Sequence, residues 1–260
     1  MTEKVIVITG ASAGIGAALA KQLAARGEKL VLAARREAEL KKVSSDCGAD
    51  AFPVVADVTQ RADVERIHDE ALRAFGHVDV WINNAGRGIG RQVLDLTDAD
   101  FDEMMAVNTK SALYGMQAIV PHFKERGEGH LINVSSALGR IPFASFRSAY
   151  CAAKAALNSL TTNLRMDLSA EYPDIHVSVV MPPMVSTDFA RNALHGTPMP
   201  PGGFRPGSEG QTPEQVAAAI VDLIDHPKPE LYTNPGHAET VARYYADVAA
   251  FEEGMRRSYL

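Results

Sequence analysis

The sequence has 260 residues, of which 46% are hydrophobic and 22% charged, and its formal net charge is -6. This length and hydrophobic content fit one large α/β domain with a filled core and argue against a disordered chain. A net negative charge argues against a general nucleic-acid or anionic-membrane surface, because such a surface needs a basic face.

The cysteines and histidines form no recognisable site. Cys47 and Cys151 stand far apart without a CxxC or Cys/His spacing, and the eight histidines are scattered. The sequence therefore predicts no metal site and suits a reducing compartment. Met1 leads almost directly into the apolar run at Val5, and no later stretch approaches the roughly 18 apolar residues of a membrane span. We expect a soluble cytoplasmic protein with no membrane or nucleic-acid partner.

The chain opens with a strand, a glycine-rich turn and a helix. Residues 5–8 read Val-Ile-Val-Ile, which is typical of a strand buried on both faces of a parallel sheet. An Ala-rich helix is predicted from Ala17 to Arg26. In the turn between them, Gly10 and Gly14 allow the backbone to approach a pyrophosphate, and Gly16 lets helix and sheet pack closely. With the N–H groups of the helix N-terminus this turn indicates a dinucleotide site, the alternative being an ordinary strand-to-helix turn.

Two arginines follow the second strand, which is predicted from Lys29 to Ala34. An enzyme that selects NAD usually presents an acidic residue at this place to bind the ribose diol, whereas Arg35 and Arg36 can grip a 2′-phosphate. The sequence therefore favours NADP over NAD. A solvated pair of arginines at a strand end is the alternative.

An acidic residue follows the third strand, which is predicted from Ala51 to Ala56 after a helix from Glu37 to Cys47. Asp57 stands where it either accepts a hydrogen bond from an adenine amino group or serves as a turn residue before a helix capped by Thr59. That helix carries one apolar stripe, formed by Val64, Ile67, Ala71 and Phe75.

The fourth strand, predicted from Val78 to Ile82, runs into the sequence Asn-Asn-Ala-Gly at residues 83–86. Sheets of this kind bind ligands at the carboxyl ends of their strands, so the two amides are candidate ligand contacts.

A long helix is predicted from the capping box of Thr97 and Asp100 to about Lys124. Asn108 falls within its apolar stripe, where a buried amide needs hydrogen-bond partners, either from the backbone or from a functional site. The other members of the stripe are Phe101, Met104, Met105, Ala112 and Met116.

The next part of the chain brings a fifth strand, a helix and a sixth strand. The fifth strand, from His130 to Val134, ends in two serines. The helix from Ser148 to about Glu171 is rich in Ala and Leu, which allows close packing against other helices. The sixth strand is predicted from Ile175 to Met181.

An irregular segment and a helical tail complete the sequence. The segment of about residues 188–211 holds too many Pro and Gly residues for one long helix or strand. A loop of this length in a compact domain is usually a lid or binding segment. A helix then starts at Thr212 with a capping box and Pro at its first position. A last strand is predicted from Leu231 to Thr233, and a helical tail from about residue 238 to residue 260.

Tyr150 and Lys154 lie four residues apart in a predicted helix, so their side chains share one face. A tyrosine hydroxyl titrates near 10, and to act near neutrality its pKa must fall by about 3, which corresponds to about 4 kcal/mol. A cation about 4 Å away, at an effective dielectric of about 20, supplies on the order of 4 kcal/mol. Lys154 can therefore make Tyr150 a usable proton donor. The alternative is a packed Tyr beside a solvated Lys.

Four motifs at matching spacing make the sequence similar to the short-chain dehydrogenase/reductase family over nearly its full length. They are the TGxxxGxG turn at residues 9–16, the NNAG segment at residues 83–86, Asn108, and a Ser ahead of the YxxxK set at residues 150–154. The resemblance implies a single doubly wound Rossmann-type α/β domain, residues 1–260, with a parallel sheet of about seven strands.

The resemblance also implies an activity, the NADP(H)-dependent interconversion of a carbonyl and an alcohol. Tyr150 would exchange a proton with the substrate oxygen, and Lys154 would lower the Tyr150 pKa and bind the nicotinamide ribose. Ser136 would hold the carbonyl oxygen, and Asn108 would fix a water that links Lys154 to solvent. Arg35 matches the position of a basic residue in NADP-preferring members. The implied cofactor contacts are Gly10, Ser12, Gly14, Ile15, Gly16, Arg35, Arg36, Asp57, Val58, Asn84, Ala85, Gly86, Tyr150, Lys154, Pro182, Val185 and Thr187.

The sequence departs from the family pattern at two places. Thirteen residues separate Ser136 from Tyr150, where the family usually has twelve, so the loop between them carries an insertion. Ser135 is the less suitable catalytic serine, because its side chain should point to the opposite face. The family's Pro-Gly pair after the sixth strand is Pro182-Pro183 here, which removes a flexible glycine and a backbone donor.

We therefore predict an NADP-dependent oxidoreductase, acting mainly as a reductase of a small carbonyl substrate. The alternatives are a non-catalytic NADP-binding redox sensor or assembly module, which the full set of catalytic residue types disfavours, and a sugar-nucleotide epimerase, which Asn108 and the NNAG segment disfavour. Phe143, Phe146 and Phe204 indicate an apolar substrate pocket or simple loop packing. By analogy with the family we expect a homodimer or homotetramer formed through the two long helices.

Overall fold

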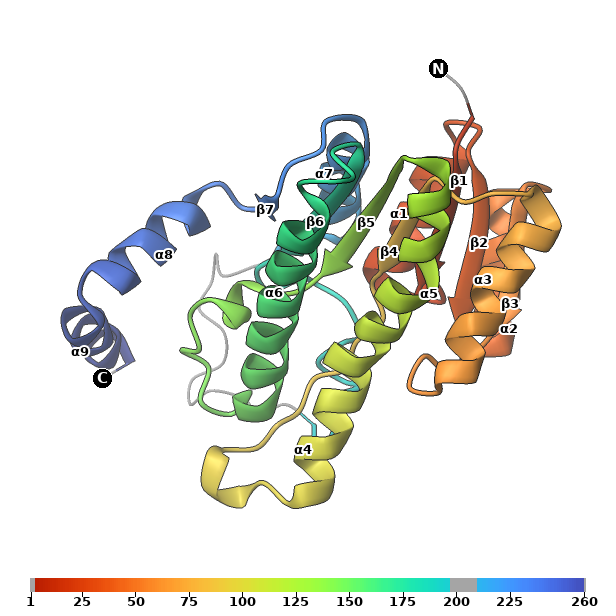
Figure 1. Ribbon diagram of the computed structural model, residues 1–260. Helices are drawn as coiled ribbons and strands as arrows, with labels where there is room; N and C mark the ends of the chain where they lie inside the picture. Colours follow the sequence, from red (N-terminus) through yellow and green to blue (C-terminus); the bar gives the residue numbers. More distant parts are fainter. Residues whose placement is uncertain (1–2, 197–209, 260) are drawn as a thin grey trace.

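The computed structural model describes residues 3–196 and 210–259. These residues form a seven-stranded parallel sheet with helices on both faces (Figure 1), which confirms the predicted fold class. The strand order is β3-β2-β1-β4-β5-β6-β7. From β1 the chain first builds one half of the sheet and then, from β4 on, the other half. Doubly wound sheets bind nucleotides at this switch point between β1 and β4. The strands span Val5–Thr9 (β1), Lys29–Ala34 (β2), Ala51–Val55 (β3), Val80–Asn83 (β4), Gly129–Val134 (β5), Ile175–Met181 (β6) and Glu230–Tyr232 (β7).

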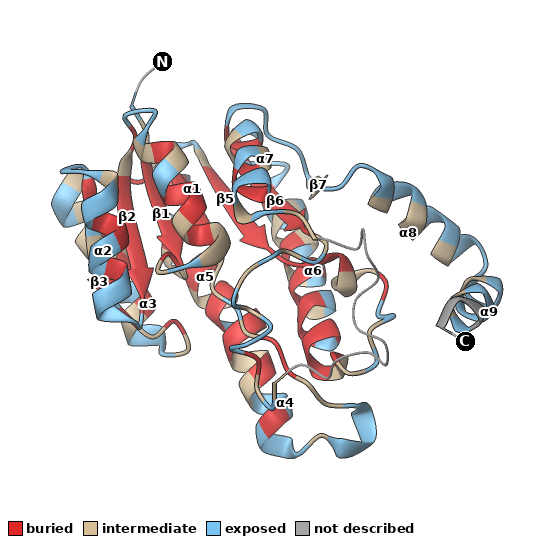
Figure 2. Cartoon of the chain, turned by 180° about the vertical axis from the view of Figure 1, so that it is seen from behind, coloured by how far each residue is buried: buried red, intermediate tan, exposed pale blue. Residues whose placement is uncertain are grey.

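The helices that connect these strands turn their buried sides toward the sheet, as Figure 2 shows. The described helices span Gly14–Ala24 (α1), Glu37–Cys47 (α2), Arg61–Phe75 (α3), Asp98–Met105 (α4), Ser111–Arg126 (α5), Ser148–Leu168 (α6), Pro213–Asp225 (α7), Gly236–Ala246 (α8) and Val248–Tyr259 (α9).

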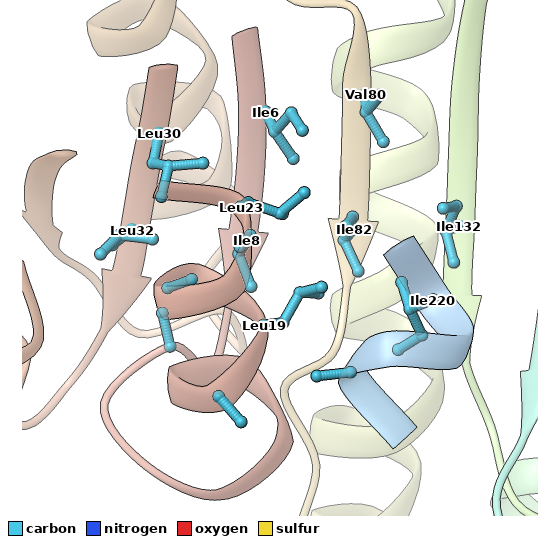
Figure 3. Close-up of a cluster of buried hydrophobic side chains, with 14 of the residues drawn as sticks. Ile6, Ile8, Leu19, Leu23, Leu30, Leu32, Val80, Ile82, Ile132 and Ile220 are labelled. Carbon is cyan, nitrogen blue, oxygen red and sulfur yellow. The ribbon is translucent and has the colours of Figure 1, made fainter. Parts of the chain in front are cut away.

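Alternating side chains of the buried strands divide the core into two layers. Ile6 and Ile8 of β1 face the layer formed with α1, α2 and α7. Val5 and Val7 face the opposite layer, formed with α3, α5 and α6. Figure 3 shows the first layer, where Leu19 of α1 packs beside β1. Each fully buried Ile or Leu contributes about 1.5–3 kcal/mol, so both layers hold the carboxyl edge of the sheet rigidly.

The predicted long helix from Thr97 to Lys124 is wrong in one respect, because a π-helical turn at Ala106–Lys110 separates α4 from α5. The Ser111 N–H donates to the Ala106 carbonyl five residues earlier, so one extra residue is accommodated in the turn. The extra residue shifts the phase of the apolar stripe. Within α4, Phe101 of the predicted stripe is 44% exposed, whereas Met104 is fully buried.

Other boundaries differ from the predictions by small amounts. The first helix begins at Gly14, inside the glycine motif, and not at Ala17. Gln60 precedes the third helix, so the predicted cap at Thr59 is wrong. The capping boxes at Thr97 and Thr212 are both confirmed, with Asp100 and Gln215 as the reciprocal partners.

The C-terminal tail consists of two helices and not one. The backbone is extended at Asp247, between α8 and α9, and the two helices stand away from the sheet beyond β7 (Figure 1). A hydrogen bond from the Tyr245 hydroxyl to the Arg140 carbonyl, 3.1 Å long, joins α8 to the loop before α6. The predicted lid, residues 188–211, lies outside the described residues from 197 to 209. In the described parts of the chain no helix is long and apolar enough to cross a membrane.

Candidate active site

The glycine turn after β1 adopts the backbone that its sequence predicts. Gly10 and Gly14 have φ angles of +69° and +56°, a region that side chains with a Cβ rarely occupy. A Cβ on Gly16 would lie 2.5 Å from the Gly10 carbonyl oxygen, so only glycine fits where α1 meets the turn. Ala13, the residue before α1, has no side-chain oxygen with which to cap the helix. The first N–H groups of α1 thus have no side-chain cap, and together with the glycine turn they could hold the pyrophosphate of a dinucleotide.

The NNAG segment is fastened to this turn through Thr9, a residue that the sequence analysis did not assign. The Thr9 hydroxyl accepts hydrogen bonds from the N–H groups of Asn84 (3.0 Å) and Ala85 (3.2 Å). The Asn84 side chain donates to the Thr9 carbonyl at 2.9 Å. Asn83 instead lies in the core, where its amide donates to Asn133 at 2.9 Å. Only the second asparagine of the pair therefore faces the cleft.

The two arginines after β2 lie at the outer end of the same cleft. Arg36 donates to the Ser12 hydroxyl at 3.1 Å, which connects it to the glycine turn. The Arg35 guanidinium lies 3.8 Å from the Asp57 carboxylate, and both arginine side chains are about half exposed. The other Asp57 oxygen accepts from the N–H and hydroxyl of Thr59, at 3.0 and 2.8 Å. Asp57 is thus the predicted turn residue, and its remaining oxygen is the one near Arg35.

Ser136, Tyr150 and Lys154 come together at the inner end of the cleft. The Ser136 hydroxyl lies next to the Tyr150 phenol, whose pKa it lowers, and it accepts a hydrogen bond from the Leu138 N–H at 3.2 Å. The Lys154 ammonium donates to the Val134 carbonyl at 2.9 Å and lies 5.8 Å from the centre of the Tyr150 ring. The Ser135 hydroxyl donates to the Lys154 carbonyl at 3.3 Å.

Burial dominates the protonation of both catalytic candidates. Burial raises the pKa of Tyr150 to about 12, although the hydrogen bond from Ser136 opposes this rise. Burial also lowers the pKa of Lys154 to about 7. This direction is opposite to the depressed Tyr150 pKa expected from the sequence, because removing the phenolate from water outweighs the groups that stabilise it. At neutral pH Tyr150 holds its proton, which is the state a proton donor requires.

Asn108, in the π-turn, uses its side-chain amide to bind backbone groups of two segments. Its amide donates to the carbonyls of Arg87 (2.9 Å) and Met104 (3.1 Å), and its oxygen accepts from the Arg87 N–H at 3.1 Å. A Cβ on Gly86 would lie 2.9 Å from the Asn108 oxygen and 3.6 Å from the Lys154 nitrogen. Asn108 therefore fixes the backbone against which Lys154 packs, while its predicted water contact stays a prediction.

One open cleft of about 2350 Å³ connects all these groups. Thr187, after β6, closes the cleft over the glycine turn, since its methyl group would lie 3.2 Å from a Cβ on Gly14. Two of the predicted residues, Gly16 and Asn108, are not among the described residues that line the cleft. The other predicted residues line it, namely Gly10, Ser12, Gly14, Ile15, Arg35, Arg36, Asp57, Val58, Asn84, Ala85, Gly86, Ser136, Tyr150, Lys154, Pro182, Val185 and Thr187.

The substrate end of the cleft contains residues that sequence reasoning missed. The Phe189 ring stands edge-on to the Tyr150 ring with centroids 5.6 Å apart, and Arg147 is buried nearby. No motif marks either residue, although Arg147 precedes Tyr150 by three positions at the start of the same helix. Phe143 and Phe146 line the cleft as predicted, and Phe204 lies outside the described residues.

Residues 4–197 match the family model of the short chain dehydrogenases. The chain belongs to the short-chain dehydrogenase family. It is therefore an oxidoreductase of that family, with the Rossmann-type fold described above. The chain is 37% identical over 236 residues to the uncharacterized oxidoreductase YxnA of Bacillus subtilis, a match that covers 89% of this chain and 65% of that protein. It is 32% identical over 230 residues to an uncharacterized oxidoreductase of Staphylococcus aureus, covering 88% of this chain and 94% of the relative.

Solved structures of family members share the fold and differ in cofactor. A short chain dehydrogenase/reductase from Burkholderia phymatum in complex with NAD superimposes with a TM-score of 0.85, at 29% identity over 95% of both chains. An alcohol dehydrogenase from the archaeon Thermococcus sibiricus, complexed with 5-hydroxy-NADP, has a TM-score of 0.77 at 28% identity over 89% of this chain and 96% of its own. Family membership alone therefore does not choose between the two cofactors.

Proposed function

We propose that this short-chain dehydrogenase is an NADPH-dependent reductase of carbonyl compounds. The observation that carries the proposal is one continuous cleft with two chemically different ends. Two arginines mark the outer end, and Ser136, Tyr150 and Lys154 mark the inner end. Because cellular NADP is kept mainly reduced, the reductive direction is the expected one.

In this proposal the residues of the cleft have distinct roles in binding the cofactor and in reducing the carbonyl. The glycine turn and the α1 N-terminus hold the pyrophosphate, and Arg35 and Arg36 bind the 2′-phosphate through charge-assisted hydrogen bonds. When bound, the nicotinamide supplies or accepts the hydride. Ser136 donates to the substrate carbonyl oxygen and holds it beside the phenol. Tyr150 then gives its proton to that oxygen as negative charge develops there, and the nearby Lys154 charge stabilises the phenolate that remains.

Calorimetric titration with NADPH and separately with NADH tests the cofactor assignment. We expect NADPH to bind clearly more tightly than NADH. The enzyme should then oxidise NADPH when it is supplied with a panel of carbonyl compounds. Equal binding of the two nucleotides would remove the phosphate-binding role of the arginines. Tight NADPH binding without turnover of any carbonyl would favour a non-catalytic redox sensor instead.

A further inference from the structure

Arg147 is a buried cation beside the reacting tyrosine. It immediately precedes α6, three residues before Tyr150, and only 8% of its surface is exposed. Its guanidinium donates to the Ile89 carbonyl at 3.1 Å. The guanidinium carbon lies 5.4 Å from the centre of the Phe146 ring and 5.9 Å from that of Phe189. Arg147 thus touches both the loop after β4 and the segment after β6.

These two segments are also joined by their backbones. The Leu194 N–H donates to the Gly88 carbonyl at 2.9 Å, and the Gly90 N–H donates to the Leu194 carbonyl at 2.8 Å. The Ser148 hydroxyl adds a hydrogen bond from the start of α6 to the Arg91 carbonyl, 2.8 Å long. Three segments that are far apart in the sequence therefore meet around one guanidinium.

The guanidinium is closely packed on the side of Gly88 and Phe189. A Cβ on Gly88 would clash with the Arg147 guanidinium and lie 2.8 Å from the Phe189 ring. The Phe189 ring in turn contacts the Tyr150 ring, at 5.6 Å between centroids. A displacement of Arg147 is therefore passed on to Tyr150 through Phe189, because packed groups transmit shifts to their neighbours.

Arg147 also interacts electrostatically with the phenol. Burial lowers the pKa of Arg147, and the nearby Tyr150 and Cys151 oppose this effect.

We propose that Arg147 is a positioning residue of the active site, whose guanidinium joins the loop after β4 to the segment after β6 and so holds Phe189 against the Tyr150 ring. This inference rests on the proposed carbonyl reduction. The charge of Arg147 also favours the phenolate and opposes the effect of burial on the Tyr150 pKa. The other titratable groups facing the phenol are Cys151 and Lys154, and the Ser136 hydroxyl is its neutral hydrogen-bonding neighbour.

The test compares Arg147→Met with Arg165→Met, a matched control on the same helix. Arg165 also donates to backbone carbonyls, those of Val177 (3.1 Å) and Pro229 (3.2 Å), but it lies about 22 Å along the helix from Tyr150, at about 1.5 Å per residue. For each variant kcat, KM, the NADPH Kd, the thermal midpoint and the pH profile of carbonyl reduction are measured. Both variants are expected to lose thermal stability.

Only Arg147→Met is expected to lose kcat, by about 10- to 100-fold, because small misplacement of a catalytic group has effects of this size. Its NADPH Kd should stay within about twofold. The alkaline limb of its pH profile should move to higher pH, since the phenolate loses a favourable charge. Arg147→Lys, which restores the charge, should return the limb toward its wild-type position.

Two results would overturn the positioning role. One is an unchanged kcat and pH profile in Arg147→Met. The other is a rise in KM restricted to anionic carbonyl compounds, which would make Arg147 a substrate ligand instead. If Arg147→Met does not fold, the effect of Arg147→Lys is measured with and without Phe189→Leu. We expect Phe189→Leu to remove most of that effect, and an equal fold-loss in both backgrounds would contradict the proposal.

The same measurements separate this inference from the proposed function. A wild-type protein that turns over no carbonyl would remove the proposed function, and the positioning role with it. An active wild-type protein with an equally active Arg147→Met variant would remove the positioning role alone.

Discussion

The ammonium nitrogen of Lys154 lies 5.8 Å from the centre of the Tyr150 ring, and its hydrogen bond goes to the Val134 carbonyl. At about 6 Å and an effective dielectric of about 20, a unit charge stabilises a phenolate by about 3 kcal/mol, less than at direct contact. Both side chains are buried, so burial disfavours the charged form of each. Tyr150 is therefore a neutral phenol at neutral pH. Beside it stands an amine whose pKa of about 7 lets it change charge near neutrality.

Lys154→Met should stabilise the protein at neutral and acidic pH, by roughly 1–4 kcal/mol, because an apolar group replaces a buried amine. The sign follows from the depressed pKa of Lys154, about 7 in the folded protein against 10.5 as its ordinary value. Between these values the unfolded chain binds more protons, so the wild type gains stability as pH rises. The advantage of the variant should thus be greatest below pH 7 and vanish above 10.5.

Urea unfolding of both proteins at several pH values measures this difference. A constant difference across the pH range would show that the Lys154 amine carries no burial penalty.

Gly10→Ala should abolish nucleotide binding and destabilise the fold, and Gly27→Ala is its matched control. Both glycines have positive φ, +69° and +80°, so each substitution adds about 1–2 kcal/mol of backbone strain. Only at Gly10 does the added Cβ meet another group, the Ala85 Cα at 2.8 Å. Thermal unfolding and NADPH titration of both variants make the comparison. Equal losses in the two variants would mean that the close approach at Gly10 has no functional role.

Replacing Arg35 and Arg36 together by Ala should weaken NADPH binding by about 100-fold, since hydrogen bonds between charged groups contribute about 1.5–3 kcal/mol each. Binding of NADH should change by less than about threefold. Arg73→Ala is the control, because Arg73 is exposed on α3 and pairs with Glu70. Isothermal titration of each variant with NADPH and with NADH measures these changes. Equal weakening of NADPH and NADH binding would contradict a specific contact with the 2′-phosphate.

Ser136→Ala should lower kcat by about 10²–10³-fold, as expected for the loss of a donor to a developing oxyanion. Ser135→Ala should have a much smaller effect, because its hydroxyl donates to the Lys154 carbonyl and not to the phenol. Steady-state reduction of one carbonyl substrate by both variants gives the comparison. A larger loss in Ser135→Ala would reverse the assignment of the catalytic serine.

The fold was predictable where one local pattern determines the structure. The unbroken apolar run of β1 and the capping boxes at Thr97 and Thr212 need no tertiary information. The π-turn around Asn108 was not predictable, because its extra residue depends on hydrogen bonds to Arg87, which is distant in the sequence. The break at Asp247 likewise has no Pro or Gly to announce it.

The candidate site was predictable where residues follow a strand end directly or have a fixed spacing in one helix. The glycine turn and Ser136 belong to the first class, and Tyr150 and Lys154 to the second. Arg147 and Phe189 do not, because their meeting depends on how the loops after β4 and β6 fold over the sheet. The Tyr150 pKa was predicted with the wrong sign, since the sequence shows a neighbouring cation but not the depth of burial.

Reduction of a carbonyl panel by NADPH, followed by the loss of NADPH absorbance with wild-type protein and Tyr150→Phe, tests the central claim most directly. Phe keeps the ring that packs on Phe189 and removes only the hydroxyl. We predict turnover of at least one carbonyl by the wild type and a loss of at least about 10²–10⁴-fold in the variant, with the NADPH Kd unchanged. Comparable turnover by the two proteins would show that Tyr150 is not the proton donor.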